Sequence, residues 1–240
     1  MTRRAAIVTG ASAGIGLAMC QRLVGDGYAV TMLGRDPERI SAAAQGLGGE
    51  VTAVSGDAAD EAILAGLVED HLARYGRLDV AVANAGFGSA GAVGETQARH
   101  LERALRVNVA APFALARLAM PALRLAGAEH GGAWLVVTAS ISGLWPAAGF
   151  AAYSASKAAA LSLARSVAAE EAAQGVRACA ICPAFVDTAM TAWTRDRVPA
   201  EAMLQPADAG AALGFLLALS PAASVTELVI GRTGAGPFAP

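Results

Sequence analysis

The sequence predicts a single α/β domain over residues 1–240, built on a doubly wound, seven-stranded parallel sheet with helices on both faces. Seven short apolar runs of strand type recur along the chain, and stretches with helical periodicity separate them. A glycine-rich turn follows the first run directly and leads into the first helical stretch. Strands that alternate with helices indicate parallel pairing and a sheet that is covered on both faces.

The predicted strands occupy residues 5–9, 28–33, 51–55, 78–83, 133–139, 176–181 and 225–230. Helical stretches between them include residues 15–27, 60–76 and 98–123. Pro112 and Pro121 lie inside the last stretch, and we expect them to bend it. Residues 183–205 form a long loop, and long loops in compact domains often act as lids, whereas residues 231–240 form an irregular tail.

The composition limits the partners that the protein can have. Apolar residues make up 55% of the chain, charged residues 16%, and the net charge is −2. Because no basic or acidic block occurs, we expect neither nucleic acid nor an anionic membrane as a partner. The apolar excess suits closely packed helices, and it also suits surfaces that are buried between subunits.

No stretch of the sequence is expected to span a membrane. The longest uncharged stretches, residues 131–156 and 209–226, are interrupted by serine, proline and, in the first, glycine. The basic N-terminus leads straight into a strand and lacks the longer apolar region of a signal peptide. We therefore expect a cytoplasmic protein.

Cysteine and histidine spacing does not indicate a metal or redox site. The chain has three cysteines, and Cys179 and Cys182 form a C-x-x-C motif within a predicted strand. Their odd spacing turns the two thiols to opposite faces of the sheet, which favours core packing over redox or zinc chemistry. His71, His100 and His130 show no ligand spacing, so no metal site is expected.

The turn TGASAGIG after the first strand is typical of dinucleotide binding. Gly10, Gly14 and Gly16 permit a tight turn and let the backbone approach a pyrophosphate at the N-terminus of the next helix. The alternative is a turn that only closes the strand onto the helix. The position after the first strand of a β/α alternation favours nucleotide binding.

The end of the second strand indicates which nicotinamide cofactor is bound. An acidic residue there would hold the ribose hydroxyls of NAD, but this chain has Gly34 followed by Arg35. Arginine at this place accommodates the 2′-phosphate of NADP. NADP(H) is therefore favoured over NAD(H), unless Arg35 is a surface residue that pairs with Asp36 or Glu38.

Tyr153 and Lys157 stand four residues apart in a helical stretch and therefore share a face. A free phenol has a pKa of about 10, and a nearby cation lowers it, so Lys157 would help Tyr153 to exchange a proton with an alcohol oxygen. Ser140 follows the fifth strand, at the edge where active sites of doubly wound sheets lie. The alternative is an ordinary helix tyrosine beside a solvated lysine.

These motifs, with Asn84-Ala85-Gly86 after the fourth strand, occur in the order and spacing of the short-chain dehydrogenase/reductase family. The chain resembles this family, and hence its Rossmann fold, over nearly its whole length. The resemblance implies a catalytic set of Asn108, Ser140, Tyr153 and Lys157. It implies that the cofactor is held by Gly10, Ser12, Gly14, Ile15, Gly16, Arg35, Asp57, Asn84, Ala85, Gly86, Tyr153, Lys157, Pro183, Val186 and Thr188.

The same resemblance implies a role for each catalytic residue. Asn108 would support a local helix distortion and a water-linked proton path, and Ser140 would orient the substrate. Tyr153 would be the general acid/base, and Lys157 would bind the nicotinamide ribose and tune the tyrosine. In the cofactor set, Asp57 would contact the adenine.

Three features depart from the family pattern. Ala184 stands where a glycine is usual, and alanine would be strained there if the position required a positive φ. Ala13 replaces a basic residue that is common in NADP-dependent members, which leaves Arg35 as the clear phosphate anchor. The segment 225–234 lacks the usual V-D-G-G ending.

The residues expected around the substrate are mostly apolar and aromatic, which suits a hydrophobic carbonyl compound. They are Phe87, Ser142, Leu144, Trp145, Phe150, Phe185, Met190 and Trp193. Such aromatic residues also pack lids and subunit contacts. Arg195 and Arg197 could hold an anionic group such as a phosphopantetheine phosphate, or they could be solvated residues of the lid.

Three functions remain open from the sequence. The first is an NADP(H)-dependent ketoreductase or alcohol dehydrogenase, and the second is a reductase of 3-oxoacyl thioesters on a carrier protein or coenzyme A. The third is a non-catalytic NADP-binding regulatory protein, which the intact catalytic set disfavours. The resemblance also implies a homo-oligomer, a dimer or tetramer, formed through the long helices after the fourth and fifth strands.

Overall fold

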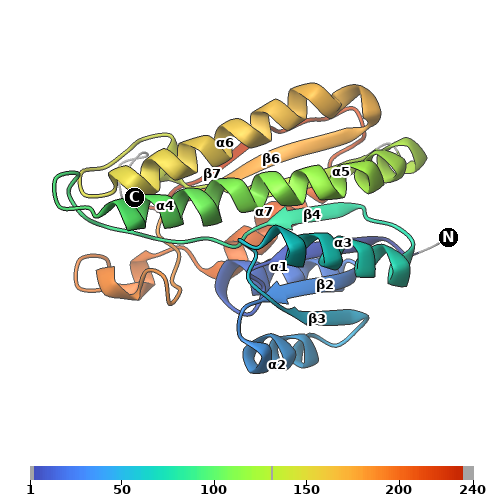
Figure 1. Cartoon of the computed structure of the whole chain (residues 1–240), viewed down its shortest axis with the longest axis horizontal. Helices are drawn as coiled ribbons and strands as arrows, with labels where there is room; N and C mark the ends of the chain where they lie inside the picture. The colour runs from blue at the N-terminus through green and yellow to red at the C-terminus, as the bar shows by residue number, and fades with distance from the viewer. Residues whose placement is uncertain (1–2, 131, 235–240) are drawn as a thin grey trace.

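The structure is a computed structural model that describes residues 3–130 and 132–234. Its centre is a seven-stranded sheet of order β3-β2-β1-β4-β5-β6-β7, in which every neighbouring pair is parallel (Figure 1). The strands are β1 (Ala5–Thr9), β2 (Ala29–Gly34), β3 (Val51–Ser55), β4 (Val80–Ala83), β5 (Ala133–Thr138), β6 (Val176–Pro183) and β7 (Glu227–Ile230). The seven predicted strands and the predicted fold class are therefore confirmed.

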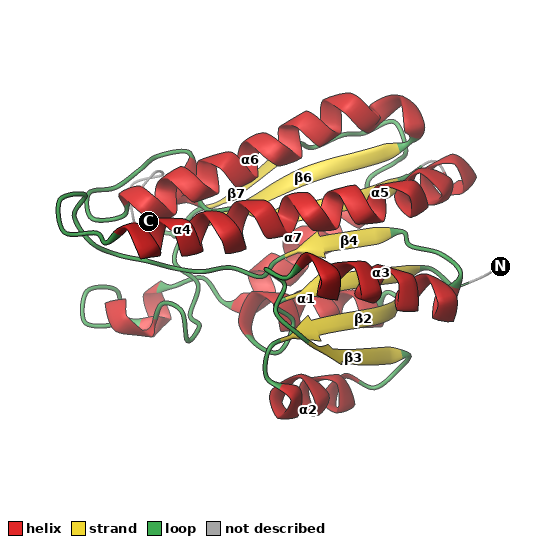
Figure 2. Ribbon diagram, viewed as in Figure 1, coloured by secondary structure: helices red, strands yellow, loops and turns green. Residues whose placement is uncertain are grey.

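Helices cover both faces of the sheet (Figure 2). One face carries α3 (Glu61–Tyr75), α5 (Ala111–His130) and α6 (Ala151–Glu171), whose side chains share a core that includes Leu67, Leu123 and Leu161. The other face carries α1 (Gly14–Gly25), α2 (Pro37–Leu47) and α7 (Pro206–Ala218), packed around Met19 and Leu213. The central strands are buried on both faces, which explains their continuous apolar runs.

The two cysteines of the C-x-x-C motif lie on opposite faces of the sheet, as their odd spacing predicts. Cys179 belongs to the core that α1 and α7 cover, and Cys182 belongs to the core that α5 and α6 cover. Both thiols are buried and free, and burial raises the pKa of each to about 12. They therefore serve as core residues.

The helical stretch expected over residues 98–123 contains a local distortion. It consists of α4 (Ala98–Leu105), a π-helical turn over Arg106–Ala110, and α5. The amide of Ala111 donates to the carbonyl of Arg106, five residues back, and Pro112, which has no amide hydrogen, follows immediately. The π turn places Asn108 on the buried side of the helix.

The helix over residues 98–129 is long and apolar enough to cross a membrane by those two criteria alone. However, 56% of its most apolar window is buried inside the protein, as in the core helix of a globular domain.

The order of the strands positions the site. The chain builds outward from β1 to β2 and β3, then returns to the other side of β1 with β4. The crevice outside the carboxyl ends of β1 and β4 is the place where doubly wound sheets bind ligands.

Candidate active site

A cavity of about 680 Å³ opens at the carboxyl ends of the strands, and the loops that follow β1 to β6 line it. It brings together residues that are far apart in the sequence, from Gly10 to Trp193. Of the predicted cofactor residues, every one except Gly16 lies in its wall, and Gly16 packs directly behind the turn. One cavity therefore joins the glycine turn to the tyrosine and the lysine.

The turn after β1 requires each of its three glycines. Gly10 and Gly14 have φ values of +64° and +56°, in the left-handed region that favours glycine. A Cβ atom on Gly16 would lie 2.3 Å from the carbonyl oxygen of Gly10 and 2.5 Å from Nδ2 of Asn84. Helix α1 can approach β1 and β4 this closely only because position 16 has no side chain.

The N-terminus of α1 is suited to hold an anion. Its N-cap residue, Ala13, has no side chain that could cap the helix, and the first turn contains no acidic residue. The backbone N–H groups of the first turn are therefore not capped by the N-cap side chain and can donate to an anion. The helix dipole also favours negative charge there. This end faces the cavity through Ser12, Gly14 and Ile15, so the residues present fit a dinucleotide pyrophosphate.

Hydrogen bonds of Asn84, which follows β4, link the ends of β1, β4 and β5 beneath the cavity. Its Nδ2 atom donates to the carbonyl oxygens of Thr9 and Gly10, both at 3.1 Å. Its Oδ1 atom accepts from the hydroxyl of Thr138 at 3.1 Å, while the Thr9 hydroxyl accepts from the amides of Asn84 and Ala85. Thr138 was not predicted as a site residue, and its only signal in the sequence is its position at the end of a strand.

Asn108 uses its side chain to fix the backbone beside the cavity. Its Oδ1 atom accepts from the amide of Phe87 at 2.8 Å, and its Nδ2 atom donates to the carbonyl of Phe87 at 2.9 Å. Nδ2 also donates to the hydroxyl of Ser156 at 2.9 Å, and that hydroxyl donates to the carbonyl oxygen of Tyr153 at 2.7 Å. Asn108 is 1% exposed and lies behind the wall, so it positions Phe87 and the tyrosine helix from beneath.

Tyr153, Ser140 and Lys157 meet at the end of the cavity between β5 and α6. Burial raises the pKa of Tyr153 above its usual value, and a hydrogen bond with Ser140 partly offsets this effect. The Nζ atom of Lys157 donates to the carbonyl oxygen of Thr138 at 2.7 Å and lies 5.8 Å from the centroid of the Tyr153 ring. Burial lowers the pKa of Lys157 to about 8.

Ser140 and Lys157 contact different parts of this group. The hydrogen bond with Ser140 lowers the pKa of Tyr153, whereas the ammonium group of Lys157 is directed to the carbonyl oxygen of Thr138. The expected effect of Lys157 on the pKa of Tyr153 stays a prediction. In addition, the Ser140 hydroxyl accepts from the amide of Ser142 at 3.1 Å, which holds Ser140 in place.

The opposite end of the cavity carries two arginines after β2. Arg35 and Arg39 both line it, and neither forms an ion pair with a described residue. The carboxylate of Asp36 instead caps α2 by accepting from the amides of Glu38 and Arg39. The alternative of an Arg35 paired with Asp36 or Glu38 is therefore not seen in the described part of the chain. Arg39 was not predicted as a site residue.

Gly34 and Asp57 complete this end of the cavity. A Cβ atom on Gly34 would lie 3.0 Å from Cδ1 of Ile40, so a carboxylate-bearing side chain at this position would require Ile40 to move. Asp57 follows β3 and lines the cavity, and its Oδ1 atom accepts from the amide of Ala59 at 3.0 Å.

The loop after β6 forms the other wall and contains the 3-10 turns Ala192–Thr194 and Ala200–Ala202. It projects beyond the sheet at the left of Figure 1, in orange, and a bridge between Val186 and Leu204 closes its base. Among the described residues no non-glycine residue has a positive φ, so Ala184 is not strained at the position where the family has glycine.

Most of the predicted substrate residues lie in this part of the cavity. Its wall contains Phe87, Ser142, Phe150, Phe185, Met190 and Trp193. Leu144 and Trp145 are not part of this wall, and Leu144 packs instead against the core that α5 and α6 cover. Arg195 and Arg197 also lie outside the cavity wall, and Arg195 forms an ion pair with Asp187 at 2.7 Å.

Comparisons with known proteins agree with this geometry. The profile of the family described as "short chain dehydrogenase" matches residues 4–198. The chain is 34% identical over 201 residues to 2-(R)-hydroxypropyl-CoM dehydrogenase of Xanthobacter autotrophicus, covering 81% of this chain and 79% of that protein.

Two solved structures superpose on nearly the whole chain. One is a 3-ketoacyl-(acyl-carrier-protein) reductase from Brucella melitensis complexed with NADH, with a TM-score of 0.88, 27% identity and coverage of 95% of this chain and 96% of that chain. The other is a variant of the actinorhodin polyketide ketoreductase with NADPH, with a TM-score of 0.88, 26% identity and the same coverage. The chain therefore belongs to the short-chain dehydrogenase/reductase family of oxidoreductases.

Proposed function

We propose that this protein is an NADP(H)-dependent oxidoreductase that interconverts a ketone and a secondary alcohol, and that it acts on a hydrophobic carbonyl compound. One observation carries the proposal: the glycine turn and the Ser140–Tyr153–Lys157 group line one cavity. The apolar and aromatic side chains of Phe87, Phe150 and Trp193 in the same wall favour an apolar substrate.

The reaction in the reducing direction follows from the residues at the β5 end. When bound, the nicotinamide cofactor supplies the hydride that the carbonyl carbon accepts. Ser140 donates a hydrogen bond to the carbonyl oxygen as negative charge develops there, and the Tyr153 hydroxyl transfers its proton to that oxygen. The ammonium group of Lys157, 5.8 Å from the centroid of the Tyr153 ring, would stabilise the phenolate that remains until it regains its proton from solvent. In the oxidising direction each proton step is reversed.

The proposed preference for NADP(H) rests on this chain's own residues. Arg35 and Arg39 would hold the 2′-phosphate, and Gly34 offers no carboxylate for the ribose hydroxyls of NAD. The two structural relatives do not decide the matter, since one is described with NADH and the other with NADPH.

The test measures NADPH and NADH oxidation by the purified protein with a panel of aliphatic and aromatic ketones. We expect turnover with NADPH, and Tyr153→Phe should lower kcat by about 10²–10⁴-fold because it removes the transferable proton. Circular dichroism and NADPH binding serve as controls for folding and for the cofactor site. Equal activity in Tyr153→Phe would contradict the proposed role of Tyr153.

A second candidate is a reductase of 3-oxoacyl thioesters, favoured by the similarity to the 3-ketoacyl-(acyl-carrier-protein) reductase of Brucella melitensis. Adding acetoacetyl-N-acetylcysteamine to the panel tests it, since a clear preference for this thioester over simple ketones would select the second candidate. NADPH binding without turnover of any compound would instead favour the non-catalytic regulatory protein.

We also propose that the protein is a homo-oligomer, a dimer or tetramer. Large apolar side chains lie exposed on the outer surface of α4 and α5, including Leu101, Leu105, Phe113 and Leu125. Exposed apolar residues along one long helix are typical of interfaces. Light scattering after size exclusion would measure the mass, and Phe113→Asp should reduce it. The cytoplasmic location stays a prediction.

A further inference from the structure

The cavity wall is strongly positive although the whole chain is not. Among the described residues that line it, five side chains are cationic and Asp57 is the single acidic one. The chain as a whole has 18 basic and 20 acidic residues, so positive charge is concentrated in this cavity. Three of the cations have a proposed role, since Arg35 and Arg39 serve the cofactor and Lys157 serves the proton transfer.

Arg103 and Arg106 are the two cations that the proposed reaction does not use. Arg103 lies in α4 and Arg106 begins the π turn, and both line the cavity. Both are exposed, and neither forms an ion pair with any residue in the described part of the chain. Their guanidinium groups are therefore available to a ligand in the cavity.

A contact with Phe87 places Arg103 at the substrate end of the cavity. The central carbon of its guanidinium lies 4.5 Å from the centroid of the Phe87 ring, which is a cation–π contact. The backbone of Phe87 is itself fixed by two hydrogen bonds with the Asn108 side chain, one donated by the Phe87 amide and one accepted by the Phe87 carbonyl. A Cβ atom on the next residue, Gly88, would lie 3.2 Å from Cγ of Met190, so this segment faces the loop after β6.

We propose that Arg103 and Arg106 form a second recognition subsite that binds an anionic group on the substrate. The group is a carboxylate, a sulfonate or a phosphate, which guanidinium groups bind through paired hydrogen bonds. The inference rests on the proposed function, and it narrows the substrate to a hydrophobic carbonyl compound with an anion at its far end. It also replaces Arg195 and Arg197 as the candidates for this role, since Arg195 pairs with Asp187.

The test compares ketones that differ only in charge. The probes are 4-oxopentanoate, 6-oxoheptanoate and 8-oxononanoate, each beside its neutral primary amide, followed by the sulfonate and phosphate analogues at the best chain length. We expect kcat/KM with NADPH to favour the anion over the amide by about 10-fold, and the preference should fall as salt rises because the arginines are exposed. The order among the three anions identifies the group that the subsite prefers.

The double variant Arg103→Gln/Arg106→Gln should bring the anion-to-amide ratio close to one. Arg99→Gln is the matched control, since Arg99 is an exposed arginine of the same helix that does not line the cavity, and it should keep the wild-type ratio. Equal rates for anions and amides in the wild type, or an unchanged ratio in the double variant, would overturn the proposal. So would a rise in the KM for NADPH with no change in that ratio, since this would assign the arginines to the cofactor.

A binding measurement separates this proposal from the proposed function. If no ketone is reduced by the wild type, the proposed function fails, and calorimetric titration of 8-oxononanoate into the NADP⁺ complex still tests the subsite. Binding that weakens about 10-fold in the double variant, but not in Arg99→Gln, supports the subsite. Equal binding in all three proteins, or none in the wild type, overturns it.

Discussion

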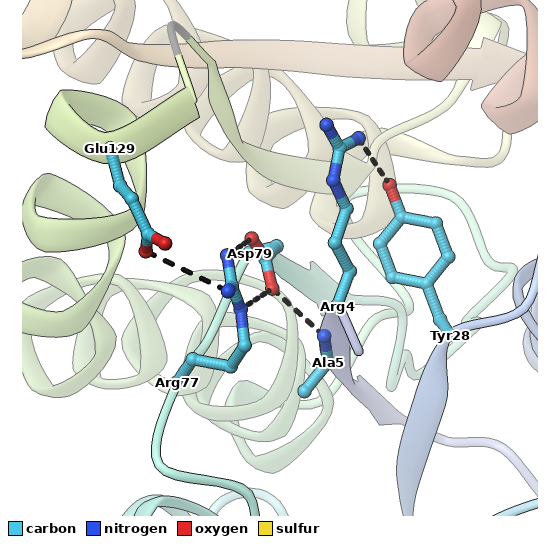
Figure 3. Close-up of polar contacts among 6 residues, drawn as sticks. All are labelled: Arg4, Ala5, Tyr28, Arg77, Asp79 and Glu129. Atoms are coloured by element: carbon cyan, nitrogen blue, oxygen red, sulfur yellow. Dashed lines mark hydrogen bonds and ion pairs between the residues drawn. The ribbon is translucent and has the colours of Figure 1, made fainter. Parts of the chain in front are cut away.

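Charged side chains have different partners at the two ends of the sheet. At the amino ends of the strands, Arg77 forms a paired hydrogen bond with Asp79, at 2.8 and 2.6 Å, and both side chains are buried (Figure 3). Asp79 also accepts from the amide of Ala5 at 2.8 Å, and Glu129 lies 3.6 Å from Arg77. The amino end uses its charges to join strands β1 and β4 to helix α5.

At the carboxyl ends, the cationic side chains face the cavity without carboxylate partners among the described residues. Lys157 is only 5% exposed, and a backbone carbonyl is its hydrogen-bond acceptor. A buried charge without an opposite charge lowers stability, so its presence indicates a role outside folding. The paired charges of Arg77 and Asp79 therefore maintain the fold, whereas the cations without carboxylate partners identify the candidate site.

The strongest effect should come from Lys157→Met at the carboxyl end. Removing the cation should lower kcat by about 10²–10⁴-fold, since Tyr153 loses the positive charge beside its phenolate. Thermal unfolding should show the protein to be equally stable or more stable, by about 1–3 kcal/mol, because a buried ammonium group is replaced by an apolar side chain. A large loss of stability would contradict the assignment of Lys157 to function rather than folding.

Asp79→Asn at the amino end should give the reverse result. It leaves the buried guanidinium of Arg77 without its carboxylate, so urea unfolding should show a loss of about 3–5 kcal/mol. The kcat of the protein that remains folded should stay near the wild-type value, because Asp79 lies at the opposite end of the strands from the cavity. Exchange of both partners for apolar residues, as Arg77→Met/Asp79→Leu, should recover much of the stability.

His71 should make the stability of the amino end depend on pH. Burial lowers its pKa to about 4, partly offset by the Arg77 backbone and by Asp79, and its Nδ1 atom lies 2.8 Å from the Thr31 hydroxyl. Because the unfolded chain binds the proton below about pH 6.5 and the folded protein does not, stability falls between pH 6.5 and about 4. The upper limit of this loss is roughly 3 kcal/mol.

His71→Gln should remove this part of the pH dependence. Urea unfolding of both proteins at pH 7.5 and pH 5 measures it, and the difference between the two pH values should be smaller in the variant. An equal difference in both proteins would show that the acid sensitivity comes from other groups.

The fold could be predicted well because the apolar periodicity of each strand and helix is a local property of the sequence. The same apolar residues then form the core that packs these elements together. The seven strands were placed to within a few residues. The π turn at Asn108 has no periodic signal and was expected only from the family resemblance.

The candidate site was predicted only in part, for a physical reason. Residues that directly follow strands converge whatever their loops do, so Asn84 and Ser140 line the cavity as expected. Tyr153 also lines it, but it lies on α6 and was assigned to the site through its spacing from Lys157 and the family resemblance. Side chains in loops and on helix surfaces can turn either way, and their direction depends on tertiary packing. Trp145 therefore lies outside the cavity, while Arg39 and Arg103 lie inside it without having been predicted.

The weakest effect should come from the arginines at the cofactor end of the cavity. It tests whether this end and the end that contains Arg103 have separate roles. Arg35→Gln should lower the ratio of kcat/KM with NADPH to kcat/KM with NADH by about 10-fold, since an exposed arginine–phosphate contact is screened by solvent. Arg39→Gln should act in the same direction, whereas Arg99→Gln should leave the ratio unchanged. If Arg103→Gln lowered this ratio as much as Arg35→Gln does, the two ends of the cavity would not be separate, and the charge at Arg103 would belong to the cofactor.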